Sequence, residues 1–294
     1  MTDRNLPDWR SILFVPVLNE RFIGGAAARG ADCIQLDLED AIPPEQKQLA
    51  REHVASVADR LSSEGCDIVV RINRPWPMAV ADIQASVRPS VRALTLPKVP
   101  HAGHIGSICE ILDEVEREKG VAAGHTGLIV MIETAEALFR MDKIARASKR
   151  IIGLIVGAED LAVSMGMRPT HQSLLAPNVQ AVAAARAAGC MPLGFVGSVA
   201  GYSDLEGYRA LIREARELGF TGAFAIHPNQ VPILNAEFAP SSEEVKAARD
   251  LIATFDQGMK EGRGAISYQG KMVDLPVVEQ ARAIVAAHAR FSSE

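Results

Sequence analysis

The stretch from Gly127 to Gly166 constrains the fold of this chain more than any other. It contains two apolar runs, Leu128–Ile132 and Ile151–Val156, with Glu133 directly after the first and Asp160 shortly after the second. A continuous apolar run of this length is typical of a strand buried on both faces of a parallel sheet. Because α/β folds place their sites at the carboxyl ends of such strands, we expect these two carboxylates to meet at one rim.

The same alternation of apolar run and helical segment continues along most of the chain. Eight apolar runs are predicted as strands: Ser11–Pro16, Cys33–Leu38, Asp67–Ile72, Ala93–Pro97, Leu128–Ile132, Ile151–Val156, Pro192–Val196 and Ala223–Ile226. Eight strands that alternate with helices fit an α/β fold of the (β/α)8 TIM barrel type better than a doubly wound sheet.

After His227 the pattern changes to two helices separated by a glycine-containing segment. We therefore predict a TIM barrel catalytic domain at residues 10–235 and a C-terminal helical extension at residues 236–294. The extension is expected to pack on a neighbouring subunit.

Composition excludes several classes of partner. The net charge is −5, so the chain has no general attraction for nucleic acid or for an anionic membrane. No uninterrupted apolar span is long enough for a membrane helix, and the N-terminus, MTDRNLPDWR, is polar rather than signal-like. These features predict a soluble, cytoplasmic protein.

Charged residues gather at the predicted carboxyl ends of the strands. They are Glu39, Asp40, Arg71, Lys98, Glu133, Asp160 and His227. Each alone could be a structural ion pair, but both signs converge on one face. Glu133 and Asp160 are the oxygen ligands that Mg²⁺ prefers, with Glu159 supporting them rather than binding the metal. Arg71 could hold a carboxylate or an enolate oxygen.

The roles of the other strand-end residues stay open at this point. Glu39 and Asp40 either orient Arg71 or a metal-bound water, or form a structural pair. Lys98 either contacts the substrate or only neutralises the acidic rim. His227 has the chemistry of a general base, but the proline that follows it favours a structural, hydrogen-bonded histidine.

Several motifs resemble the citrate lyase β-subunit (CitE-like) family of the HpcH/HpaI aldolase superfamily. They are RSILFVP (10–16), DLEDAIPPEQKQLAR (37–51), VRIN (70–73), LPKV (96–99), IETAEAL (132–138), GAEDLA (157–162) and GFTGAFAIHPNQV (219–231). The resemblance implies a Mg²⁺-dependent carbon–carbon lyase with a TIM barrel, assembled as a homotrimer or homohexamer. Its substrates would be coenzyme A (CoA) or acyl-carrier thioesters of hydroxy-dicarboxylic acids, such as citryl-, malyl- or citramalyl-CoA, cleaved or formed.

The resemblance also implies roles for single residues. Glu133 and Asp160 match the Mg²⁺ ligands, and Arg71 matches an arginine that holds the substrate. Arg10 resembles a position that helps to hold the CoA phosphates. Asp274 resembles an aspartate donated by the adjacent subunit. The candidate catalytic residues are then Arg71, Asp274, Glu39 and Asp40, and the candidate substrate-binding residues are Arg71, Glu133, Arg10 and Lys98.

Two positions depart from the family pattern near the expected mouth of the site. Val17 stands where a glycine usually follows the first strand, and Gly194 stands about where an aspartate is expected. The acyl group therefore stays open. Two other functions also stay open: a Mg²⁺-dependent aldolase that acts on free 2-oxo and hydroxy acids, and a non-catalytic subunit of a citrate lyase complex.

Overall fold

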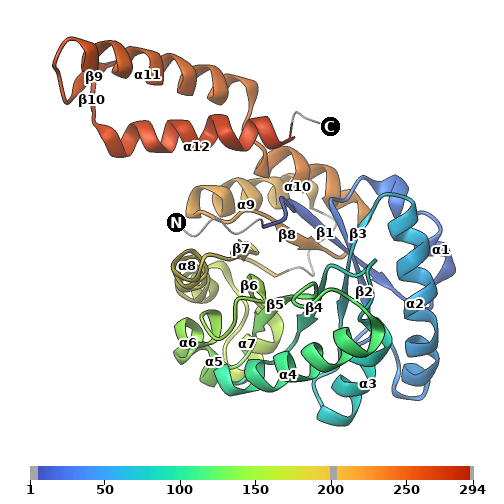
Figure 1. The fold of residues 1–294 in the computed structure, drawn as a ribbon. Coiled ribbons are helices and arrows are strands. Elements are labelled where there is room, and N and C mark those ends of the chain that lie inside the picture. The colour runs from blue at the N-terminus through green and yellow to red at the C-terminus, as the bar shows by residue number, and fades with distance from the viewer. Residues whose placement is uncertain (1–5, 199–203, 292–294) are drawn as a thin grey trace. The chain divides into compact units, whose positions relative to one another are not determined.

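The computed structural model describes residues 6–198 and 204–291, and the chain divides into two compact units (Figure 1). The units are Met1–Asn235 and Ala236–Glu294. The first unit carries the barrel and is described first.

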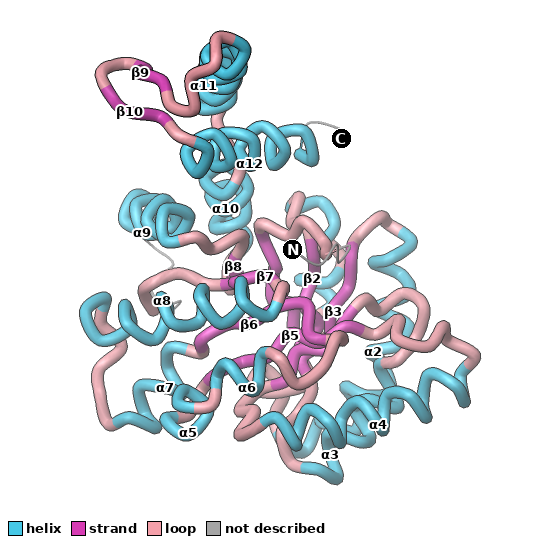
Figure 2. Tube along the Cα trace, turned by 60° about the vertical axis from the view of Figure 1, so that its left-hand side comes forward, coloured by secondary structure: helices cyan, strands magenta, loops and turns pink. Residues whose placement is uncertain are grey.

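Eight parallel strands form the barrel of the first unit. Figure 2 shows the barrel strands in magenta with helices around them. They are β1 (Ser11–Pro16), β2 (Cys33–Asp37), β3 (Asp67–Arg71), β4 (Ala93–Leu96), β5 (Gly127–Ile132), β6 (Ile151–Val156), β7 (Met191–Leu193) and β8 (Ala223–Ala225). The strands are hydrogen-bonded in the order β7-β6-β5-β4-β3-β2-β1-β8, and every neighbouring pair is parallel. This order and pairing confirm the prediction of a TIM-like barrel.

The barrel closes where β7 meets the residues before β8. Leu193 and Gly222 form a parallel bridge, and the Gly194 N–H donates to the Gly222 carbonyl at 2.9 Å. A side chain at position 222 would lie only 2.0 Å from the carbonyl oxygen of Trp9. Glycine is therefore required there for the strands to approach closely enough to close the barrel.

Helices follow the strands and surround them. They are α1 (Glu20–Ile23), α2 (Lys47–Ser63), α3 (Trp76–Ser86), α4 (Ala102–Lys119), α5 (Ala135–Phe139), α6 (Met141–Ala145), α7 (Ala158–Met165), α8 (His171–Ala188), α9 (Leu205–Leu218) and α10 (Val231–Phe238), with 3₁₀ turns η1 (Ala27–Arg29), η2 (Pro44–Gln46) and η3 (Pro228–Gln230). Among the described residues, no helix combines the length and apolarity that a membrane crossing needs.

Three local features refine the alternation of strands and helices. The segment between β5 and β6 forms two short helices, α5 and α6, which meet at Arg140. The segment after β6 forms α7, so Asp160 lies in a first helical turn rather than at a strand end. Helix α8 begins at His171, before Pro177, because Thr170 and Ser173 form a capping box that starts the helix earlier.

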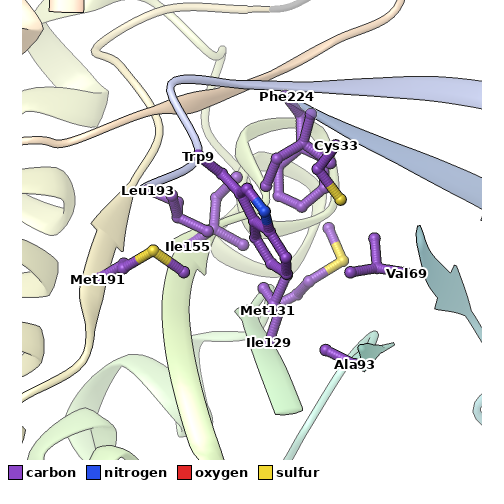
Figure 3. Close-up of a cluster of buried hydrophobic side chains, with 11 residues drawn as sticks. Trp9, Cys33, Val69, Ala93, Ile129, Met131, Ile155, Met191, Leu193 and Phe224 are labelled. Carbon is purple, nitrogen blue, oxygen red and sulfur yellow. The ribbon is translucent and has the colours of Figure 1, made fainter. Parts of the chain in front are cut away.

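The barrel interior is filled by apolar side chains from most of the strands (Figure 3). They are Trp9, Ile12, Cys33, Val69, Ala93, Ile129, Met131, Ile155, Met191, Leu193 and Phe224. Layers of branched and aromatic residues of this kind make the barrel a packed core rather than a pore. Met131, Ile155 and Phe224 also line the cavity described below, so this core forms its floor.

The second unit contains α11 (Ser242–Lys260), the strands β9 (Ile266–Tyr268) and β10 (Lys271–Val273), and α12 (Leu275–Phe291). The two strands form an antiparallel hairpin that the sequence pattern did not predict. The second unit has its own small core, which consists of Phe255, Ile266, Val273 and Val278. Asp274 lies between this hairpin and α12.

Candidate active site

A cavity of about 480 Å³ opens at the carboxyl ends of the barrel strands. Its charged lining residues are Asp37, Asp40, Arg71, Glu133, Glu159 and Asp160. They come from the ends of β2, β3 and β5 and from the start of α7. The structure therefore brings the predicted residues Asp40, Glu133, Asp160 and Arg71 to one cavity, at the barrel face where catalytic residues lie in TIM barrels.

Arg71 is held mainly by Asp37, the last residue of β2. The Arg71 Nε donates to Asp37 Oδ1 at 2.8 Å, and Nη2 donates to Asp37 Oδ2 at 2.7 Å. The Asp37 carboxylate also accepts the backbone N–H groups of Glu39 and Ala41, at 2.9 and 3.0 Å. A bidentate pair whose acid is itself fixed by the backbone holds the guanidinium in one orientation.

Three further groups surround the same guanidinium. Arg71 Nη1 lies 2.9 Å from Glu39 Oε2 and 3.2 Å from Asp40 Oδ2, and the Phe14 ring centroid lies 5.0 Å from the Arg71 Cζ. Burial alone would lower the pKa of Arg71, but the Asp37 hydrogen bonds and the three carboxylates raise it. Arg71 is therefore a permanent positive charge in the cavity wall.

Lys98 connects the acids on both sides of the site. Its Nζ lies 3.2 Å from Glu39 Oε1 and 3.5 Å from Asp160 Oδ1, and its backbone N–H donates to Glu133 Oε2 at 2.6 Å. Its φ angle of 50° is in the left-handed region, which is uncommon for a residue with a side chain. Such strain is typical of functional sites, and here it turns the N–H toward Glu133.

Of the two carboxylates predicted to bind metal, Glu133 and Asp160, Glu133 is the more buried. Burial raises its pKa to about 7, and the nearby charges of Asp160 and Glu39 act in the same direction, against the Lys98 N–H that lowers it. A Cβ at position 157 would lie 2.3 Å from Glu133 Oε1. Gly157 therefore leaves the space that the Glu133 carboxylate occupies.

Asp160 and Glu159 differ in surroundings, although both line the cavity. Asp160 is half-buried and contacts Lys98. Glu159 is exposed and accepts a hydrogen bond from the Ser198 hydroxyl. The two adjacent side chains thus have different partners in the first turn of α7.

The donor set of this site fits Mg²⁺. Glu133 and Asp160 offer hard carboxylate oxygens in one cavity, and their mutual repulsion would be relieved by a divalent cation. Glu39 Oε2 is also buried, and its contact with Arg71 lacks the alignment of a hydrogen bond. Within residues 6–198 and 204–291, no three His, Cys, Asp or Glu side chains form a ready-made metal cage. Mg²⁺ commonly keeps waters and takes only one or two carboxylates.

The sequence matches the family described as HpcH/HpaI aldolase/citrate lyase over residues 10–228. That match covers most of the chain and nearly all of the barrel unit. The chain belongs to this family.

Its relatives in the family are carbon–carbon lyases. The citrate lyase subunit beta of Leuconostoc mesenteroides subsp. cremoris is 33% identical over 279 residues, which cover 94% of this chain and 92% of that protein. The L-malyl-CoA/beta-methylmalyl-CoA lyase of Cereibacter sphaeroides is 33% identical over 299 residues, which cover 94% and 93%.

Solved structures agree with the family and the fold. The protein CitE from Mycobacterium tuberculosis, in complex with magnesium, acetoacetate and coenzyme A, aligns with a TM-score of 0.76 at 26% identity, covering 95% of this chain and 97% of that one. A citrate lyase from Burkholderia xenovorans LB400 aligns with a TM-score of 0.81 at 21% identity, covering 98% and 93%, and supports the fold alone.

Five of the residues predicted for this HpcH/HpaI-family chain do not line the cavity. Two of them, Glu39 and Lys98, contact its lining residues Arg71 and Asp160. Arg10 precedes β1, at the opposite end of the barrel strands from the cavity, and forms an ion pair of 2.7 Å with Asp32. Asp274 belongs to the second unit. His227 Nδ1 accepts the Asn229 N–H at 3.2 Å and so caps the turn after β8, which agrees with the structural alternative.

Three features of this family site are not among the residues predicted from the sequence. Asp37 lies within a predicted strand, although an acid inside an apolar run is itself a signal of a functional residue. Gly157 carried no visible signal, because its role depends on the position of Glu133. The third feature is an apolar wall, formed by Phe14, Gly194, Phe195, Gly197, Phe224 and Ile226, with Met131 and Ile155 as the floor beside it.

Proposed function

We propose that this protein is a Mg²⁺-dependent carbon–carbon lyase that cleaves or forms a 3-hydroxyacyl-CoA thioester. Cleavage would yield a 2-oxo acid and a shorter thioester. The observation that carries the proposal is the placement of Glu133, Asp160 and Arg71 around one cavity at the carboxyl end of the barrel. The names of the relatives, citrate lyase subunit beta and malyl-CoA lyase, support the same reaction class.

The reaction breaks the bond between C2 and C3 of the hydroxyacyl group. The C3 hydroxyl loses its proton to a base and becomes the carbonyl of the 2-oxo acid. The bonding electrons pass to the thioester as an enolate, which then gains a proton at C2. Mg²⁺ held by Glu133 and Asp160 would supply Lewis acidity at the hydroxyl and carboxylate oxygens.

Arg71 would act on the charge that develops in this reaction. Asp37 and Asp40 engage three of its five N–H groups, which keeps the guanidinium in place. Its remaining N–H groups can meet an enolate oxygen or a substrate carboxylate. Because the guanidinium is already fixed, it needs little reorganisation when the charge appears.

The C-terminal unit would complete the site from another subunit. We assign Asp274 to the enolate, where it would handle the proton at C2, and we assign the assembly as a homotrimer or homohexamer. A carboxylate brought in by a neighbour suits an oligomer in which every interface repeats by symmetry.

The proposal is tested by Glu133→Ala, with Glu136→Ala as the matched control. Glu136 is an exposed acid that pairs with Arg140 on the surface. Glu133→Ala should abolish Mg²⁺-dependent release of 2-oxo acid from CoA thioesters and weaken Mg²⁺ binding in calorimetry. Glu136→Ala should change neither.

A folded Glu133→Ala variant with full activity would contradict the proposal. Calorimetry with CoA separates the leading function from a free-acid aldolase, because only a thioester enzyme should bind CoA saturably. Turnover by the isolated chain would argue against a non-catalytic subunit.

A further inference from the structure

The cavity has two chemically different walls. The charged residues lie at the ends of β2, β3 and β5 and on α7. The opposite wall, from β1, β7 and β8, is uncharged and consists of Phe14, Gly194, Phe195, Gly197, Phe224 and Ile226. Met131 and Ile155, from the barrel core, form the floor between the two walls. A bound molecule therefore meets charge on one side and only apolar groups on the other.

Positive charge at this cavity is scarce. Arg71 is the one cation among the described lining residues, and it faces Asp37, Glu39 and Asp40. Five carboxylates line the same cavity, so the lining stays negative even with a divalent cation added. The described residues that directly follow β7, Gly194–Ser198, contain no lysine or arginine either. Lys98 is likewise engaged, with Glu39 and Asp160. A second carboxylate of a substrate would therefore find no cation at this cavity, among the described residues, that does not already face a carboxylate.

The position of the acids would orient the proposed substrate. Its hydroxyacyl group has to reach Glu133 and Asp160, so the bulk of coenzyme A would extend out of the mouth of the cavity. The C3 carbon carries four groups in the proposed reaction. Its hydroxyl and carboxylate would face the metal ligands, and its bond to C2 would lead toward the mouth. The fourth substituent would then point inward, to the apolar wall and the floor.

We infer that this fourth substituent is a small uncharged alkyl group, so that the 2-oxo acid product is of the pyruvate type rather than the oxaloacetate type. The inference rests on the proposed function and specifies its substrate class. A methyl group gains burial against Phe224 and Ile155, whereas a carboxymethyl group would place an unpaired carboxylate on an apolar wall. Leaving a buried charge unpaired costs far more than losing one apolar contact.

The first experiment compares three CoA thioesters with Mg²⁺ that differ only in this substituent: methyl (citramalyl), hydrogen (malyl) and carboxymethyl (citryl). The expected kcat/KM for the methyl compound exceeds that for the carboxymethyl compound at least about tenfold. Equal or better cleavage of the carboxymethyl compound would overturn the inference.

A binding measurement separates this inference from the proposed function. If none of the three thioesters is cleaved, the proposed function fails. Calorimetry with pyruvate and with oxaloacetate, each in the presence of Mg²⁺, then decides the inference by itself. Tighter binding of pyruvate supports it, and tighter binding of oxaloacetate overturns it.

A charge placed on the apolar wall should reverse the preference. Ile226 lines the cavity and is 41% exposed, so that Ile226→Arg can be accommodated without burying the new charge. This variant should raise the ratio of citryl to citramalyl cleavage at least about tenfold. Val179→Arg adds the same charge to an exposed site on α8, outside the cavity, and should keep the original ratio. An unchanged ratio in Ile226→Arg would contradict the placement of the substituent.

Discussion

Gly157 shows how a single missing side chain positions a functional one. A Cβ at this position would lie 2.3 Å from Glu133 Oε1 and 2.4 Å from Glu133 Cγ, far inside contact distance. The carboxylate can occupy its place only because residue 157 is glycine. The opposite side of Glu133 is held by the Lys98 N–H, so the carboxylate is fixed from two directions.

Gly157→Ala is therefore expected to weaken Mg²⁺ binding about 10-fold or more, because outer contacts of a metal ligand typically contribute that much to affinity. Isothermal calorimetry of the folded variant measures this. Gly106→Ala, in α4, serves as the control, since a Cβ there meets nothing within 4 Å. That change should leave Mg²⁺ affinity intact and stabilise the helix by about 0.5–1 kcal/mol. Wild-type affinity in Gly157→Ala would contradict the positioning role given to the space at residue 157.

The sequence predicts only some of the carboxylates that hold Arg71. From the sequence, Glu39 and Asp40 either orient Arg71 or a metal-bound water, or form a structural pair; in the structure both lie against Arg71. The bidentate partner is Asp37, from the neighbouring strand, and the register that aligns Asp37 with Arg71 brings them together. A strand register is a property of the sheet, so it could not be read from either run alone.

At the scale of elements, α4 is joined to the barrel by one buried carboxylate. Glu116 accepts the backbone N–H groups of Gly124 and Thr126, both at 2.8 Å. It also accepts hydrogen bonds from Arg150 Nη1 at 2.9 Å and from Arg150 Nη2 at 2.7 Å. Although burial raises its pKa, these hydrogen bonds outweigh that effect and lower the pKa to about 2. The carboxylate thus ties the end of α4 to the segments that lead into β5 and β6.

Glu116→Gln should destabilise the barrel unit by about 3 kcal/mol, since it leaves part of a buried charged network unpaired. The native pKa lies below the unfolded value, so the contribution is fully present above about pH 4.5. It should be lost as the pH falls toward 2. Urea unfolding between pH 7 and pH 3 measures the difference, and tryptophan fluorescence follows the barrel unit because Trp9 and Trp76 both belong to it.

Glu118→Gln is the control for this measurement. Glu118 is exposed on the same helix, so its replacement should have little effect at any pH. A stability difference for Glu116→Gln that stays constant from pH 7 to pH 3 would contradict the role given to this carboxylate.

At the scale of the whole molecule, the C-terminal unit contributes no residue to the lining of the barrel cavity, so its role needs a separate explanation. It has its own core and a hairpin that leads directly to Asp274. Our proposal that Asp274 acts in a neighbouring subunit predicts complementation between two inactive variants. Glu133→Ala and Asp274→Ala should each be inactive alone.

Co-refolding the two variants in equal amounts should restore about one quarter of wild-type activity, because a complete site then draws one intact residue from each of two chains. The release of 2-oxo acid by the mixed oligomer measures this. No recovery in a mixture that has demonstrably exchanged subunits would place Asp274 in its own chain's site or outside the chemistry.

The sequence by itself determined the barrel, because each strand is a local apolar run and each run ends at the same face by the rules of parallel sheets. It also located Glu133 and Arg71 at that face, since a charge at the end of a buried strand is visible without a structure, and it placed Asp160 nearby, although the structure shows it in the first turn of α7. Only the tertiary structure decided the pairing of Arg71 with Asp37, the space at Gly157 and the apolar wall opposite the acids. Each of these depends on contacts between residues far apart in the chain, and barrel closure and strand register set such contacts.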